Sequence, residues 1–294
     1  MINLLSAGFT RLFKRKTFYV CVTVMVLYGA VGIFDAFSND AAANLDEIFF
    51  EYCALIPVLM AVFCAMFIGT EYSDGTMRNK IITGHKRIVI YMSNFIICAA
   101  AGLMMCAAYI IVCLGLGIPM LGLFAGDIGV ILVRVGCSLA LLLSLTGIFA
   151  LISLTVRSKA ASAVICIILA FVTLIAGVTL YSLLQEPEYW QIYTYEGNYV
   201  EIDGDFQTAQ FDDDGNEIDI SSELKTEDVL NPFYVGGIKR QIYRFIVDFT
   251  PGGQAILIIA NEVSDPLLLA GYSVLIAVAT TAAGLIIFNK KNLN

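Results

Sequence analysis

The segment from Glu71 to Arg87 carries residue types that suit binding to another protein. It reads EYSDGTMRNKIITGHKR, with two acids near its start and basic side chains through the rest. Asp74 is placed to cap a short helix, and Gly84 is placed to end it. The pattern therefore predicts a short helix, ringed by Arg and Lys, in the middle of this segment.

The apolar residues of this predicted helix define a docking face. Met77, Ile81 and Ile82 fall on one side at helical spacing, and Arg78 and Lys80 border them. Such a helix is suited to a groove in a soluble protein, with its basic side chains on an acidic rim. An ordinary basic loop that happens to carry a helix would have the same composition, so the residues alone leave both interpretations open.

Two ionisable residues at the edges of apolar runs, Glu51 and Arg134, are candidates for a substrate path. Charge at membrane depth is costly, so it is a functional hypothesis by default. Arg134 lies about two helical turns, roughly 10 Å, inside a predicted span. It could reach outward to the membrane surface, face a substrate cavity, or pair with Asp127. Glu51 is expected at the outer edge of its own span.

Metal and nucleotide chemistry find little support in the sequence. His85 is the only histidine, and no Cys/His pair has metal-ligand spacing. No G-x-x-x-x-G-K-[ST] motif is present to cradle nucleotide phosphates. The acidic run Asp212–Glu217 fails the EF-hand pattern, because Gln210 and Ser221 stand where ligands are required. It is a solvated turn or a weak cation site. We expect no catalytic residue, resident metal, cofactor or nucleic-acid partner.

The elements that must position these residues are membrane helices. The chain has 294 residues, 59% of them hydrophobic and only 14% charged, with a mean hydropathy of +0.82. A soluble domain contains roughly 25% charged residues. Six uncharged runs are long enough to span a bilayer. The third run is long for one span and short for two with a loop, and we expect one helix in it to end near Ile118. These runs cover residues 18–34, 52–70, 88–126, 135–156, 160–185 and 266–289. The fold expected is an all-α polytopic membrane protein.

Two shorter helices are expected beside the six spans. Before the first span, apolar residues recur at helical spacing, which predicts an amphipathic helix on the membrane surface, although a plain basic flank is the alternative. These residues are Ile2, Leu5, Phe9, Leu12 and Phe13. The run Phe249–Asn261 opens with Pro251-Gly252-Gly253 and is too short to cross, so it predicts a re-entrant helix before the last span.

The segment 185–244 is the one long polar stretch, and it is rich in acids. Residues 192–202 have the pattern of strand, turn and strand, and Asp203-Gly204 and Asp214-Gly215 are hairpin turn signals. A small extracellular β-rich insertion is expected here. The chain would then divide into residues 1–184, with five spans and the coupling segment 71–87, the insertion 185–244, and residues 245–294.

The distribution of basic residues orients the predicted bundle. Most of the 17 Lys and Arg lie before the first span, in 71–87, around 157–159 and at the C-terminal end, whereas the short loops 38–51 and 120–127 contain none. Basic residues concentrate in cytoplasmic segments. Both termini and the segment 71–87 are therefore expected in the cytoplasm, and 185–244 outside the cell.

The coupling segment resembles the signature of a known family. Glu71-Tyr72, followed by Gly75-Thr76 and Arg78-Asn79, is similar to the signature of type-2 ABC exporter permeases, in particular the branch that confers bacteriocin, lantibiotic and bacitracin resistance. The resemblance covers most of the chain. It implies a coupling role for Glu71, Asp74, Gly75, Thr76, Met77, Arg78, Lys80 and Ile81.

The same resemblance implies the partners and the activity. Two cytoplasmic ATPase subunits would bind ATP and Mg, and a second permease, identical or a sister chain, would complete a dimer in the bacterial cell membrane. An amphiphilic peptide or lipid-like substrate would leave the cell or the membrane between the two permeases. This chain would be a transport subunit rather than an enzyme.

Other protein classes remain as alternatives. A membrane-anchored sensor could bind peptides through its extracellular acidic segment and would not need the coupling segment. A secondary transporter or channel should contain paired charges or repeated broken helices within the membrane, and only Arg134 and one re-entrant element are found. An intramembrane enzyme would require a catalytic constellation inside the spans, and none is visible.

Overall fold

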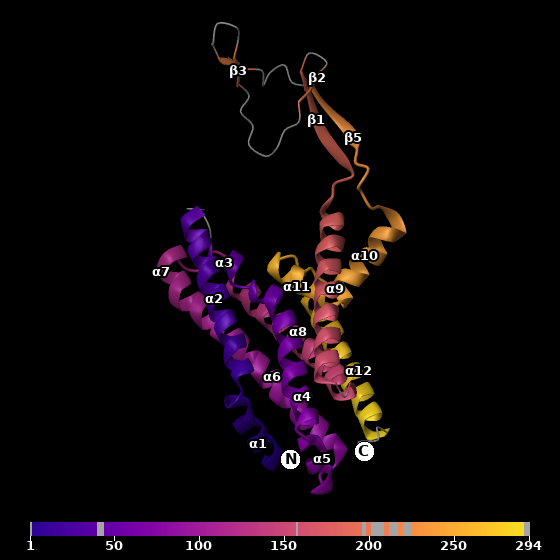
Figure 1. Cartoon of the computed structure of the whole chain (residues 1–294). Coiled ribbons are helices and arrows are strands. Elements are labelled where there is room, and N and C mark those ends of the chain that lie inside the picture. The colour runs from indigo at the N-terminus through magenta and orange to yellow at the C-terminus, as the bar shows by residue number, and fades with distance from the viewer. Residues whose placement is uncertain are drawn as a thin grey trace. The chain divides into compact units, whose positions relative to one another are not determined.

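A computed structural model of the chain describes residues 2–39, 44–156, 158–195, 198–200, 209–211, 217–219 and 225–290. The chain divides into two compact units. The first contains Met1–Thr179 and Phe245–Asn294, and the second contains Leu180–Arg244. Among the described residues, every strand belongs to the second unit, and the first unit is helical (Figure 1).

Six helices are long and apolar enough to cross a membrane, which confirms the predicted number of spans over the described residues. The pair α10 and α11 would add a seventh if it were one broken span. The six are α2 (Lys16–Asn39), α4 (Tyr52–Ser73), α6 (Arg87–Val112), α8 (Ile128–Thr155), α9 (Lys159–Gln185) and α12 (Pro266–Lys290).

The third span runs further than the sequence predicts. After α6, a π-helical turn, η1 (Cys113–Gly117), leads into α7 (Ile118–Leu121), and the helix ends at Gly122 with φ +88° rather than near Ile118. Proline has no amide hydrogen, and its ring crowds the preceding turn of an α-helix. The wider π turn ahead of Pro119 accommodates that ring, so the helix continues past the expected end.

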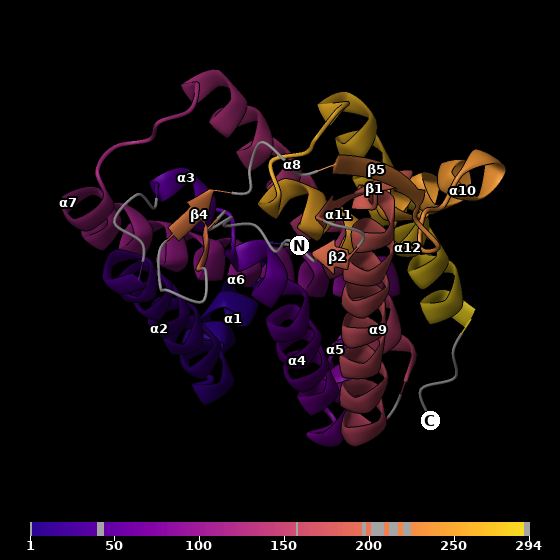
Figure 2. The ribbon, with the colours of Figure 1, turned by 90° about the horizontal axis from the view of Figure 1, so that it is seen from above.

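The core of the first unit forms around α8, which packs against α12, α4, α6 and α11. The spans differ greatly in the fraction of their residues that is buried by this packing. Of the most apolar stretch of the span Leu45–Ser73, which contains α4, 72% is buried within the chain, against 22% for α2 and 17% for α9. Figure 2 shows α4 between α2 and α9 when the bundle is viewed along its length. The outer faces of α2 and α9 are therefore left for lipid or another protein.

Three short helices accompany the spans of the first unit: α1 (Ile2–Phe13), α3 (Leu45–Ile48) and α5 (Thr76–Ile82). The helix α1 packs on α6, with Leu4, Gly8 and Leu12 buried. A Cβ atom at Gly8 would lie only 2.0 Å from Cδ1 of Ile97, so the glycine permits this close approach. The buried face differs from the predicted apolar face, since Phe13 is exposed. A position at the membrane surface remains a prediction.

Near its C-terminal end, the chain turns sharply between α10 (Gly237–Phe249) and α11 (Pro251–Ile259), by 89°. The hydroxyl oxygen of Thr250 accepts a hydrogen bond from the amide of Gly253 (3.4 Å), and Pro251 occupies the first helical position. Both features are typical helix starts. The nine-residue α11 is too short to span, in keeping with the predicted re-entrant element.

The second unit contains two small antiparallel sheets. The strands β1 (Tyr189–Tyr195), β2 (Asn198–Val200) and β5 (Lys225–Leu230) pair in the order β2-β1-β5, and β3 (Ala209–Phe211) pairs with β4 (Glu217–Asp219). Tyr195 pairs with Asn198 where the sequence predicts a hairpin. The predicted turns at Asp203-Gly204 and Asp214-Gly215, and most of the acidic run 212–217, lie outside the described residues.

A buried asparagine joins the segment before β1 to the segment after β5 in the second unit. The side-chain amide of Asn231 donates to Glu186 Oε2 and to the carbonyl of Pro187, both at 2.9 Å, and its oxygen accepts from the amide of Phe233. The helix α10 begins inside the segment predicted as a β-rich insertion, so that segment also contains helix. Its extracellular position remains a prediction.

Candidate functional site

The coupling segment begins with a turn rather than with a side-chain cap. Asp74 is the C-cap residue of α4, and its amide donates to the carbonyl of Thr70 (3.0 Å). Gly75 then adopts φ +67° and precedes the first residue of α5. The prediction that Asp74 caps this helix is therefore wrong. A left-handed glycine separates the two helices, and the Asp74 side chain lies 3.6 Å from Arg15 instead.

The end of α5 is as predicted at Gly84. This residue has φ +85°, and its amide donates to the carbonyl of Ile81 (2.9 Å), while the amide of His85 donates to the carbonyl of Lys80 (3.1 Å). These two bonds form a Schellman motif, which stops a helix by satisfying its last carbonyl groups. The segment 71–87 thus forms a short helix with a glycine turn at each end.

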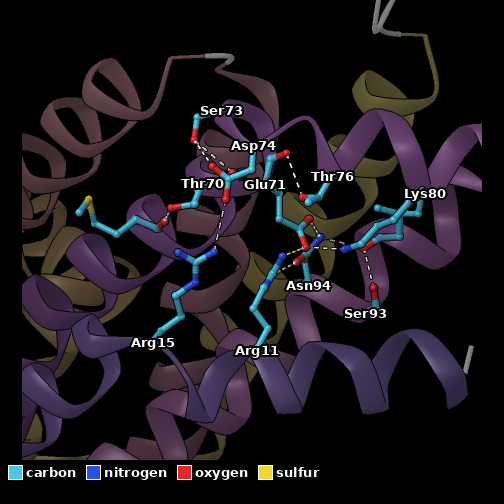
Figure 3. Close-up of polar contacts among 12 residues, drawn as sticks. Arg11, Arg15, Thr70, Glu71, Ser73, Asp74, Thr76, Lys80, Ser93 and Asn94 are labelled. Carbon is cyan, nitrogen blue, oxygen red and sulfur yellow. Dashed lines mark hydrogen bonds and ion pairs between the residues drawn. The ribbon is translucent and has the colours of Figure 1, made fainter.

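A buried carboxylate connects this helix to the bundle. The side chain of Glu71, at the end of α4, is completely buried and accepts hydrogen bonds from three side chains (Figure 3). Arg11 of α1 and Lys80 of α5 form ion pairs with it, and the amide of Asn94 of α6 donates to it at 3.0 Å. These four residues are called the Glu71 cluster below. They join four helices at one carboxylate.

The cluster balances a buried acid with an excess of positive charge. Arg11 also lies over the ring of Phe67, 3.9 Å from its centroid, and the side-chain amide of Asn94 donates to the carbonyl of Ile90 (3.2 Å). A buried carboxylate is tolerated only when it is paired and hydrogen-bonded, and removing one partner leaves a costly unpaired charge. The cluster is therefore sensitive to any movement that separates α5 from α4.

The remaining signature residues fix the same corner. The hydroxyl of Tyr72 donates to the carbonyl of Leu154 at the end of α8 (2.5 Å), and the hydroxyl of Thr76 donates to the main-chain carbonyl of Glu71 (3.1 Å). With Gly75 in the turn, each residue of the Glu-Tyr-x-x-Gly-Thr pattern has a distinct structural contribution. The pattern therefore specifies how α5 is held against α4 and α8.

Part of the predicted docking face is turned inward. Met77 is only 1% exposed, and Lys80 is paired with Glu71, so neither is free to bind a partner as predicted. Ile81 is half-buried, whereas Arg78 and Ile82 are exposed. The spacing correctly groups the apolar residues on a helix. It does not reveal that the bundle covers the Met77 side.

Arg134 caps a helix end inside the bundle. It is 3% exposed, and its guanidinium donates to the carbonyl of Ile258 (3.1 and 2.5 Å) and to that of Ile259 (3.3 Å) at the end of α11. It also lies 3.9 Å from the ring centroid of Phe50. It neither reaches the surface nor pairs with Asp127, whose side chain caps its own helix, α8. A cation suits the negative end of a helix dipole.

A buried glutamine fixes the other side of α11. The amide nitrogen of Gln254 donates to the carbonyl of Asp248 (2.9 Å), and its oxygen accepts from the hydroxyl of Ser273 of α12 (2.5 Å). Glu51, the other predicted path residue, is partly buried directly before α4 and forms a side-chain hydrogen bond with Tyr28. Glu51 and Arg134 thus interact with different groups.

Sequence reasoning missed three of these polar residues: Arg11, Asn94 and Gln254. The signal for Asn94 is clear in retrospect, because it is the only side-chain amide in the uncharged run 88–126. In the run 249–261, Gln254 is likewise the only side-chain amide before the last residue, Asn261. Arg11 carries no such signal, since it looks like any basic flank of a first span. Within the described residues, no cluster of His, Cys, Asp or Glu could hold a metal ion.

The comparison with protein families identifies the family of the chain. The family model described as ABC-2 family transporter protein matches residues 4–177, which is more than half of the chain and includes all four residues of the Glu71 cluster. Neither the curated proteins nor the solved structures contain a match to the chain. The chain therefore belongs to the ABC-2 transporter family and is a multi-pass permease subunit of an ABC transporter.

Proposed function

We propose that this permease exports an amphiphilic substrate, an antimicrobial peptide or a lipid-like molecule, and that a separate ATPase subunit drives it through α5. The observation that carries the coupling part of the proposal is the Glu71 cluster. It ties a short, partly exposed helix to α1, α4 and α6 through one buried carboxylate. A force applied to α5 would therefore act on two spans and on the N-terminal helix together.

The exposed surface of α5 is the proposed docking face for the ATPase. Ile82 is 71% exposed, and Arg78 is exposed on the same short helix. A single apolar anchor among basic side chains fits an apolar groove with an acidic rim. Met77 and Lys80 have the complementary role on the other side, where they hold α5 to the bundle.

The proposed assembly contains two permeases and two ATPase subunits, with ATP and Mg bound only by the ATPases. The poorly buried α2 and α9 leave apolar faces that support association with lipid and with a second permease. The concentration of Lys and Arg at the α5 end supports a cytoplasmic position for α5 and both termini. The resistance branch rests on the Glu71–Asn79 signature, and the substrate class follows from that resemblance.

The docking face can be tested by a charge placed on Ile82. Ile82→Asp should abolish co-purification of the co-expressed ATPase with a tagged permease in lipid nanodiscs. Ile82→Leu keeps the apolar side chain and should retain the ATPase. Leu267→Asp is the matched control, because Leu267 is 87% exposed in the first turn of α12, away from α5 in the sequence.

The transport part of the proposal needs a second measurement. Candidate lantibiotics should stimulate ATP hydrolysis by the purified complex, and Glu71→Gln should reduce this stimulation while the ATPase stays bound. If Ile82→Asp and Leu267→Asp both retain the ATPase and its activity, α5 is not the docking site. A permease that purifies without any ATPase would favour a sensor that binds peptides through its acidic segment.

A further inference from the structure

The last residue of the coupling segment contacts a span that the Glu71 cluster does not include. Arg87 is the first residue of α6, and its guanidinium donates to the main-chain carbonyl groups of Phe288 (3.1 Å) and Asn289 (2.9 Å). Both carbonyl groups belong to the last turn of α12. The coupling segment is therefore attached to α1, α4 and α6 through Glu71 at its beginning, and to α12 through Arg87 at its end.

The charge of Arg87 is unfavourable at the start of its own helix and favourable at the end of α12. A cation in the first turn of a helix lies near the positive end of the helix dipole, whereas a cation at the last turn interacts with the negative end. The last four carbonyl groups of a helix also lack partners within that helix. The guanidinium of Arg87 supplies donors to two of them, so this residue links two helices and is more than a basic flank of a span.

Close packing of α6 on α12 continues one turn beyond Arg87. Tyr91 is fully buried, and a Cβ atom at Gly284 of α12 would lie 2.1 Å from its hydroxyl oxygen and 2.5 Å from its Cζ atom. The ring centroids of Tyr91 and Phe288 lie 6.4 Å apart. The Tyr91 hydroxyl has no hydrogen-bond partner among the described residues. The contact of Tyr91 with α12 is therefore steric, and the bonds from Arg87 provide a polar link beside it.

The helix α12 is suited to carry a displacement along its length. It is one α-helix of 25 residues, and its only proline is its first residue, Pro266. Sharp kinks need a proline, a π-bulge or a similar interruption inside a helix. It also packs closely on α8, where a Cβ atom at Gly147 would lie 2.4 Å from Oγ1 of Thr280 and 3.3 Å from the Cα atom of Ala277. A displacement of its last turn therefore moves the helix as a whole.

Nearer its start, α12 is bonded to α11. The hydroxyl of Ser273, which is 1% exposed, donates to Oε1 of Gln254 (2.5 Å), and Nε2 of Gln254 donates to the carbonyl of Leu269 (3.4 Å). Ser273 and Phe288 are 15 positions apart in the chain, which corresponds to about 22 Å along an α-helix. The helix α12 thus connects Arg87 of the coupling segment to the short helix α11.

We propose that Arg87 is a positioning residue for coupling, through which a movement of the coupling segment displaces α12 and, with it, α11. The inference rests on the proposed function, since it requires an ATPase that moves α5. It adds a second route to that of the Glu71 cluster, which acts on α1, α4 and α6. Arg87 and the Gln254–Ser273 pair then serve one route from its two ends.

Amide hydrogen exchange of the permease–ATPase complex in lipid nanodiscs tests the proposal, with and without a non-hydrolysable ATP analogue. In the unchanged complex, the analogue should change the exchange rates of α5 and of α11, the latter by at least about fivefold, which is the lower end of ordinary coupling between sites. Arg87→Met should remove most of the α11 response and leave the α5 response and ATPase binding intact. Arg87→Lys should restore part of the α11 response, because lysine keeps a cation at the end of α12.

Two further variants control for charge and for folding. Lys86→Gln removes the same charge one position earlier, where the side chain is exposed and forms no hydrogen bond or ion pair with the described residues, so it should leave the α11 response unchanged. Ser273→Ala alters the other end of the route and should reduce the α11 response although Arg87 is intact. It tests the same route if Arg87→Met does not fold, and thermal unfolding of each variant separates a lost response from a lost fold.

Three results would overturn the proposal and leave the proposed function intact. A full α11 response in Arg87→Met would assign the transmission to α4, which also packs on α11. An equal loss in Lys86→Gln would indicate a general effect of charge at the start of α6. A full α11 response in Ser273→Ala would exclude the route through Gln254. A complex in which α5 itself does not respond to the analogue would instead contradict the proposed function, and this inference with it.

Discussion

The Glu71 cluster and the Arg134 site both bury a charge in the helical bundle, but they compensate it in different ways. Glu71 is paired with two cations from other helices and with an amide from a third. Arg134 is paired with main-chain carbonyl groups at one end of α11. The first arrangement depends on where side chains of separate helices lie, whereas the second depends on one helix end.

This difference suggests different roles. A carboxylate shared by four helices changes its energy when any one of them moves, so it suits the transmission of a movement. A guanidinium on a helix terminus satisfies carbonyl groups that have no partner within α11, so it fixes the position of that short helix. Four substitutions test these roles. The eight buried cysteines provide a common readout, since a thiol-reactive dye labels them on unfolding.

Glu71→Ala is expected to have the largest effect. It leaves Arg11 and Lys80 facing each other without a counter-charge, and breaking a buried pair in this way costs about 4 kcal/mol. The thiol-dye melting temperature should fall strongly. Glu71→Gln should lose less, because its amide oxygen can still accept from Asn94. If Glu71→Ala melts like the unchanged protein, the cluster does not hold α5.

Gly252→Ala should be nearly as damaging. A Cβ atom at Gly252 would lie 1.9 Å from the carbonyl oxygen of Thr173 in α9, and overpacking against backbone costs about 3 kcal/mol. The matched control is Gly136→Ala in α8, where no atom lies within 4 Å. The control should change the melting temperature little. Equal melting of the two variants would show that Gly252 does not lie against the backbone of Thr173.

Arg134→Met should lower the stability by about 2 kcal/mol, because the carbonyl of Ile258 loses a charged donor. Arg134→Lys should recover only part of the loss, since lysine cannot match the two donors of a guanidinium. Hydrogen exchange should rise in α11 in the Met variant and stay unchanged in α5. An equal rise of hydrogen exchange in α5 and α11 would contradict the conclusion that Arg134 acts on α11 independently of the Glu71 cluster.

Asp74→Asn should have the smallest effect. The Asp74–Arg15 pair is exposed, and such pairs contribute less than about 0.5 kcal/mol in most cases. The melting temperature should therefore stay close to that of the unchanged protein, also at low salt. A loss comparable to that of Glu71→Ala would mean that Asp74 belongs to the coupling machinery after all.

Several features were predictable because they depend on local sequence. Span number follows from the length of apolar runs, and the start of α11 follows from Thr250-Pro251, since both are set within a few residues. The end of α5 follows from Gly84, the residue with least cost in a left-handed conformation. The end of the third span was misjudged because a π turn before Pro119 is not visible in the sequence.

The site itself was only half predictable. The spacing of Met77, Ile81 and Ile82 identifies a helical face, but it cannot reveal what covers that face. Asp74 and Gly75 are both acceptable helix starts, and the left-handed turn decided between them. For Arg134 the sequence offered three plausible environments, and none of them was the carbonyl end of α11.

Sequence patterns alone identify a six-span membrane protein with a short helix that stops at Gly84 in the segment 71–87, because hydropathy and turn chemistry act over a few residues. Which charged side chains meet depends on the packing of the helices. Arg11, Lys80 and Asn94 reach Glu71 from three other helices, and Arg11 lies 60 positions from Glu71 in the chain. Which residues are brought together over such separations depends on how whole helices pack, and no local pattern records that packing.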